Sequence, residues 1–190
     1  ISGVVAIDGK TLRGSKHDAS GKGALHLVSA YAHEAGVVIG QRAVDAKSNE
    51  ITAIPELLNS LVLNGAIVTI DAMGTQKDIA AKIRERNADY LLALKGNQGT
   101  LHDDAKDFFN DPVLSADCPV HSDTDLGHGR IEQRVCRVAD ARPWLTERHP
   151  DWTELNTIAE IRSTRTNKKT GEVSTETRLY ISSLPPSPEV

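Results

Sequence analysis

Cysteine is scarce in this sequence, and that narrows the classes of protein it could belong to. Only Cys118 and Cys136 occur among 190 residues, which is too few for a disulfide framework or a cysteine-based metal site. No run approaches the roughly 18 apolar residues that a membrane helix requires, and no signal peptide is recognisable. We therefore expect a cytoplasmic protein with no membrane partner.

A general excess of positive charge is also missing. The formal net charge is −4 at pH 7, which by itself argues against a nucleic-acid-binding protein, although local clusters of Lys and Arg matter more than the sum. The chain begins with Ile1 rather than Met. We therefore expect a fragment, whose last residue need not be a natural end.

Apolar runs alternate with polar breaks along the first 115 residues. The pattern predicts three strands in meander order, followed by alternating helices and strands. A polar loop is expected over 10–23. From about residue 116 the pattern is typical of strands joined by turns. The expected strands span 4–8, 25–30, 37–44, 66–70, 89–97, 129–138, 157–166 and 174–184, and the expected helices span 49–64, 75–88 and 100–111.

Two of the apolar strands end in aspartate. Asp8 follows "VVAI" and Asp71 follows "AIVTI". A meander, a crossover helix and a fourth strand parallel to the first would bring the two carboxylates together. Adjacent carboxylates repel each other unless a cation lies between them, and Mg²⁺ prefers such oxygen ligands. The alternative is that each aspartate is a turn residue at a strand end.

Five motifs, in this order, resemble a known family. "AIDGKTLRGS", "VTIDAMGTQ", "YLLALKGNQ", "GHGRIEQR" and "LYISSL" are similar to bacterial insertion-sequence transposases of the H-repeat-associated type, which are DDE transposases. The resemblance covers nearly the whole chain. It implies an α/β fold with an RNase H-like catalytic core over 1–115, an inserted β-rich subdomain over 116–184, and a linker over 185–190 toward a missing C-terminal helix.

The resemblance also implies roles for particular residues. In that family the first two catalytic acids end strands one and four, which correspond to Asp8 and Asp71. These would bind Mg²⁺ or Mn²⁺, with two ions in a complete site. The third acid is carried on a helix with a His-Trp-x-Ile-Glu-Asn pattern, which this sequence lacks, so we expect it beyond Val190. Glu132 is the candidate within the chain, although its surroundings alternate as in a strand.

Basic and amide side chains near the motifs predict contacts with a DNA backbone. Each could instead belong to a solvated loop or strand face. Further basic residues, Arg134, Arg162, Arg165, Lys168 and Lys169, lie on the late strands and their turn. The candidate DNA contacts are Lys10, Arg13, Lys95, Asn97, Gln98 and Arg130.

The predicted function is metal-dependent DNA cleavage and strand transfer of an insertion sequence, by a homodimer bound to transposon ends and target DNA near the bacterial nucleoid. One alternative is an inert transposase remnant that only binds DNA or a partner. Another is a phosphatase, because "AIDGKT" faintly resembles the nucleophile strand of the haloacid dehalogenases. That motif requires a second acid two residues after the first, where this chain has Lys10.

Overall fold

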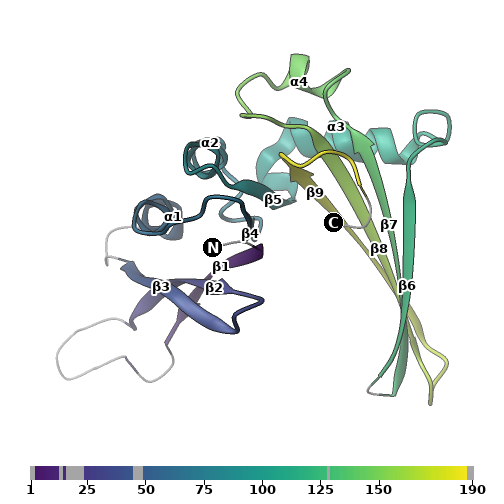
Figure 1. The fold of residues 1–190 in the computed structure, drawn as a ribbon. Helices are drawn as coiled ribbons and strands as arrows, with labels where there is room; N and C mark the ends of the chain where they lie inside the picture. The colour runs from purple at the N-terminus through teal and green to yellow at the C-terminus, as the bar shows by residue number, and fades with distance from the viewer. Residues whose placement is uncertain (1–2, 13–14, 16–23, 45–48, 128, 188–190) are drawn as a thin grey trace. The chain divides into compact units, whose positions relative to one another are not determined.

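The structure is a computed structural model that describes residues 3–12, 15, 24–44, 49–127 and 129–187. It is a mixed α/β fold in which strands predominate (Figure 1), and at that level the expected fold class is confirmed. The chain forms two compact units. The first comprises Ile1–Leu92 with Asp151–Thr153, and the second comprises Ala93–Pro150 with Glu154–Val190. The functional boundaries expected after residues 115 and 184 stay predictions.

The first unit is built on a sheet with the strand order β3-β2-β1-β4-β5. Its first three strands form the expected antiparallel meander, and β4 and β5 run parallel to β1. The strands are β1 (Gly3–Thr11), β2 (His26–Ala32), β3 (Val37–Val44), β4 (Ala66–Ile70) and β5 (Asp89–Leu94).

Helices α1 (Glu50–Asn59) and α2 (Lys77–Glu85) complete this unit. Asn49 caps α1 by accepting a hydrogen bond from the Thr52 N–H at 3.3 Å. Its buried stripe includes Ile54 and Leu57, whose spacing of three residues keeps them on one face of a helix. Burying each such side chain contributes about 1.5–3 kcal/mol. The helix ends earlier than predicted, because residues 60–65 form a turn before β4.

The second unit contains an antiparallel sheet with the order β9-β8-β7-β6. Among its residues Trp144 stacks on Phe108 at 5.0 Å between ring centroids. Its elements are η2 (Gly96–Gln98, a 3₁₀ helix), α3 (Gly99–Asn110), β6 (Val120–Gly127), β7 (Arg130–Asp140), α4 (Leu145–Arg148), β8 (Thr157–Asn167) and β9 (Val173–Ser182).

Three local predictions were wrong. Residues 120–127 were expected to lie outside the strands, but they form β6 and pair with β7 along their whole length. Lys10 was placed in a loop, yet β1 continues to Thr11 and pairs Lys10 with Leu27. The strand expected over 89–97 stops at Leu94, and Gly96–Gln98 form η2.

No helix in the part of the chain that the structure describes is long and apolar enough to cross a membrane.

Candidate active site

Asp8 and Asp71 follow the last paired residues of two neighbouring parallel strands. The β1–β4 ladder runs from Gly3↔Ala66 to Ile7↔Ile70. One further step in this register puts Asp8 opposite Asp71. Paired residues of a sheet project to the same face, and both aspartates are exposed. The topology therefore brings the two predicted acids to one point at the end of β4.

Asp71 also shapes the turn in which it lies. Its Oδ1 accepts hydrogen bonds from the N–H groups of Met73 at 3.1 Å and Gly74 at 3.3 Å. The Thr75 hydroxyl donates to the Asp71 carbonyl oxygen at 3.1 Å. A Cβ at Gly74 would lie 2.4 Å from Cγ2 of Ile70, so this turn requires glycine. Asp71 therefore stabilises the turn with its Oδ1. Its Oδ2 takes no part in the turn and is available for another function.

The opposite side of β1 carries a series of polar contacts, Thr11 to His26 to Glu50, that was not predicted from the sequence. The Thr11 hydroxyl and Nδ1 of His26 lie 2.7 Å apart, and Nε2 of His26 contacts a carboxylate oxygen of Glu50. Glu50, in the first turn of α1, lies directly over Gly9. The one signal in the sequence was Gly9 itself, because glycine inside a strand often marks a close approach by another group.

The predicted DNA contacts are distributed over both units. Lys10 is exposed on β1, and Arg13 lies outside the described residues. Lys95 is exposed and precedes η2, which contains Asn97 and Gln98. Within the second unit the hydrogen bond from Arg178 lowers the pKa of Glu176, and the charges of Arg178, Arg165 and, last, Lys95 add to that effect.

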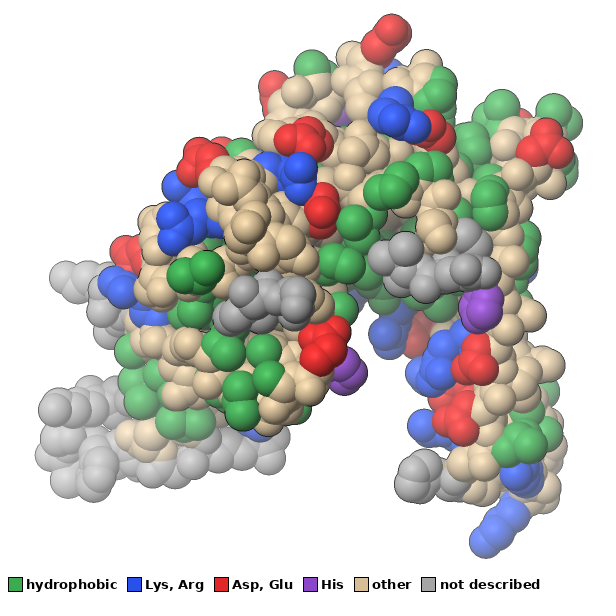
Figure 2. Space-filling view, in the orientation of Figure 1, with side chains coloured by type: hydrophobic (Ala, Val, Ile, Leu, Met, Phe, Trp, Pro, Cys, Tyr) green, Lys and Arg blue, Asp and Glu red, His purple; other side chains and the backbone are tan. Residues whose placement is uncertain are grey.

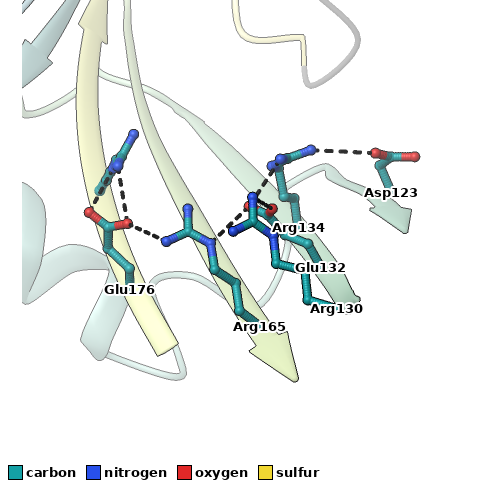
Figure 3. A network of polar contacts seen from close by, with 7 residues as sticks. Asp123, Arg130, Glu132, Arg134, Arg165 and Glu176 are labelled. Atoms are coloured by element: carbon teal, nitrogen blue, oxygen red, sulfur yellow. Dashed lines mark hydrogen bonds and ion pairs between the residues drawn. The ribbon is translucent and has the colours of Figure 1, made fainter. Parts of the chain in front are cut away.

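Glu132 lies in a different unit from Asp8 and Asp71. It sits on β7 and is only 4% exposed, with its carboxylate surrounded by arginines (Figure 3). Arg134 contacts Oε1 at 2.9 Å, and Arg165 donates to the same oxygen from Nε at 3.2 Å. The structure therefore gives this acid guanidinium partners within its own sheet.

The neighbouring arginines lower the pKa of the Glu132 carboxyl group. Partial burial alone would raise the pKa of this carboxyl group. The hydrogen bond from Arg165 and the charges of Arg134 and Arg165 outweigh that effect and hold the pKa below its ordinary value of 4.5. Glu132 is consequently a carboxylate at neutral pH.

Metal-ligating side chains do not gather in larger groups. Within residues 3–12, 15, 24–44, 49–127 and 129–187, no cluster of three or more His, Cys, Asp or Glu could hold a metal ion. Asp123 and Asp125, two further carboxylates, lie on β6 of the second unit. The described residues thus offer the Asp8–Asp71 pair and no third ligand beside it.

Comparison with known proteins agrees with the motifs. A family model described as "Transposase DDE domain" matches residues 2–178. The chain belongs to this transposase family. Its H-repeat type, expected from the five motifs, is confirmed by similarity to an "H repeat-associated putative transposase" named YhhI from Escherichia coli K12. That protein is 43% identical over 187 residues, which is 95% of this chain and 48% of the relative.

A second relative of this DDE transposase chain, "Putative transposase YncI" from Escherichia coli O157:H7, is 47% identical over 182 residues, covering 95% of the chain and 47% of the relative. The K12 protein of the same name is 53% identical over 143 residues, or 75% of the chain and 58% of the relative. The chain thus spans about half the length of these curated relatives.

Proposed function

We propose that this chain carries the paired catalytic aspartates of a transposase that cuts DNA strands and joins them to a new site. The observation that carries the proposal is the β1–β4 register, which ends with Ile7 paired to Ile70, the residues directly before Asp8 and Asp71. Family membership supports a transposase role. The chemistry, the DNA partners, the homodimer and a nucleoid location belong to the whole protein and are part of the proposal.

The aspartate pair fits a divalent metal ion. Neither the Asp8 carboxylate nor Oδ2 of Asp71 has a hydrogen bond or ion pair among the described residues. Mg²⁺ keeps several waters and needs only one or two protein carboxylates, so a cluster of three is not required for a first ion. Such an ion supplies an activated water or 3′-hydroxyl and stabilises the charge on the leaving oxygen.

The third acid of the site remains a proposal. The meander and the two parallel strands that follow support an RNase H-like core with an inserted β-rich part. In such a core the remaining carboxylate comes from a helix, which we place beyond Val190. Glu132 is the weaker candidate, because its Oε1 is already contacted by Arg134 and Arg165 and its Oε2 lies near Arg130.

The phosphatase alternative fits the topology poorly. After Asp8 the chain continues through β1 into an antiparallel meander with β2 and β3. A haloacid dehalogenase nucleophile is followed by a helical crossover instead. Position 10 is Lys10, which lies in β1, pairs with Leu27 of β2 and cannot supply the second acid.

The test is cleavage of the element's own end sequences by the full-length protein with Mg²⁺. Asp8→Asn and Asp71→Asn should each abolish cleavage, because an amide cannot replace the negative charge that holds the ion. The matched control is Asp78→Asn, an exposed carboxylate at the start of α2. It should cleave within about tenfold of wild type, equivalent to about 1.4 kcal/mol of barrier.

A thermal melt in EDTA separates catalysis from folding. Asp8→Asn should melt at the wild-type temperature or higher, since neutralising one of two neighbouring carboxylates relieves repulsion. Normal cleavage with an early melt would make Asp8 a structural residue and remove the basis of the proposal. An inert wild-type protein would support the remnant alternative.

A further inference from the structure

Three arginines surround the buried carboxylate of Glu132 on the four-stranded sheet of the second unit. We call Arg130, Arg134 and Arg165 the arginine cluster. In the β7–β8 ladder Glu132 pairs with Arg165. The other two arginines lie two residues on either side of Glu132 along β7, and so share its face. All three therefore project from one face around a single acid (Figure 3).

The exposures of the four side chains differ in a way that suggests a division of roles. The Glu132 side chain is 5% exposed, whereas those of Arg130, Arg134 and Arg165 are 51%, 44% and 39% exposed. A buried carboxylate is well placed to hold other groups and poorly placed to meet a ligand. The half-exposed guanidinium groups have the opposite character, because one edge faces Glu132 and the remainder faces solvent.

The cluster keeps hydrogen-bond donors to spare. A guanidinium has five N–H donors in a planar fork. The contact of Arg130 with Glu132 is 3.7 Å long, which is an ion pair without a hydrogen bond. Arg134 and Arg165 each make one close contact to Glu132. Three positive charges around one carboxylate leave an excess of two.

Neighbouring acidic residues reduce this excess positive charge, but they do not occupy all the N–H donors of the arginine cluster. Asp123 lies 3.9 Å from Arg134 and is 62% exposed. Glu176 lies 3.7 Å from Arg165, but its closer partner is Arg178 at 2.9 Å. Figure 2 shows this mixture of basic and acidic side chains along the sheet of the second unit.

We propose that the arginine cluster is a binding surface for DNA backbone phosphates, and that Glu132 is the positioning residue that holds the guanidinium groups in place. This inference rests on the proposed function for its choice of partner. Arg forks match phosphate oxygens in geometry and charge. Contacts of this kind fix the orientation of a duplex without reading its sequence.

The test measures binding of full-length protein to a fluorescent duplex of unrelated sequence, in EDTA, at several salt concentrations. The cluster is neutralised together with its acid, so that no buried charge is left unpaired. The control variant makes the same net charge change elsewhere in the second unit. The test variant is Glu132→Gln/Arg130→Gln/Arg134→Gln/Arg165→Gln, and the control is Asp140→Asn/Arg142→Gln/Arg148→Gln/Lys106→Gln.

The proposal predicts a smaller salt dependence for the test variant. Each lost phosphate contact lowers the slope of log K against log salt by about 0.9, so the slope should fall by about 3. The affinity at 0.1 M salt, relative to 1 M salt, should fall by roughly 500-fold on the same basis. The control variant should keep the wild-type slope. Asp123→Asn, which removes an acid beside Arg134, should bind more tightly.

Three results would overturn the proposal. One is an unchanged slope in a test variant that melts as a folded protein. Another is an equal loss in the test and control variants, which would indicate only general electrostatics. The third is unchanged DNA binding with altered self-association in light scattering, which would make the cluster an interface between copies. Because binding is measured in EDTA, failure of the proposed cleavage chemistry leaves these readouts unaffected.

Discussion

A side chain at Gly9, the neighbour of Asp8, would meet the carboxylate end of the Glu50 side chain. An ideal Cβ at this position would lie 2.1 Å from the carboxyl carbon of Glu50. That carboxylate is held by His26, which in turn contacts Thr11. The first turn of α1 is therefore tied to the end of β1 beyond the residues that pair with β4. At the residue scale, this chain of contacts fixes the strand segment that carries Asp8.

Gly9→Ala should destabilise the protein, because the Glu50 carboxylate would have to leave His26 to make room, and overpacking costs up to about 1–3 kcal/mol. The control is Gly96→Ala, where the added Cβ meets nothing within 4 Å. Urea denaturation measures both. Glu50→Ala removes the atoms that the new Cβ would meet. The loss of unfolding free energy in the double variant should therefore be smaller than the sum of the losses in the two single variants. Equal losses for the two glycine variants would contradict the close approach.

At the element scale, β6 and β7 show what the sequence pattern could and could not reveal. β7 was predicted because apolar residues recur along it, and its partner β6 was missed. All but one of the residues of β6 are exposed, since an edge strand with two solvated faces shows no alternation of apolar and polar residues. The contact of Glu132 with Arg165 could not be predicted from the sequence either, because the two residues become neighbours only through the pairing of β7 with β8.

The lowered pKa of Glu132 makes a prediction about stability and pH. A carboxyl whose pKa is lower in the folded state stabilises the fold above its unfolded value of 4.5. That contribution is lost as the pH falls through the lowered folded pKa. Glu132→Gln should therefore reduce the free energy of unfolding near pH 7 and have a smaller effect at pH 3. Urea melts at both pH values test this.

The control for this experiment repeats the Glu132→Gln substitution in a second variant. In a variant with the arginine cluster already changed to glutamine, the cause of the lowered pKa is gone. Glu132→Gln should then lose its excess effect at neutral pH. A difference between wild type and Glu132→Gln that stays constant from pH 3 to pH 7 would show that the arginines do not control this carboxyl group.

At the scale of the whole molecule, the sequence was enough for the order of the first strands and for Asp71, which directly follows β4. Asp8 was expected to end its strand, but it lies within β1 and pairs with Ser29 of β2. Apolar runs mark β1 and β4, and parallel pairing of neighbouring strands then follows from the meander and the crossover through α1. The extent of β1 was harder to predict. Its outer half is exposed and paired on one side only, so it resembles a loop in sequence.

We propose that Asp8 and Asp71 together hold one divalent ion. The direct measurement is Mn²⁺ binding to the full-length protein by electron paramagnetic resonance. Wild type and Asp78→Asn should bind with the same affinity. Asp8→Asn and Asp71→Asn should each weaken binding by about tenfold or more, because even outer partners of a metal cost that much when removed, and the double variant should be little worse than either. Equal Mn²⁺ affinity in all of these proteins would contradict the claim.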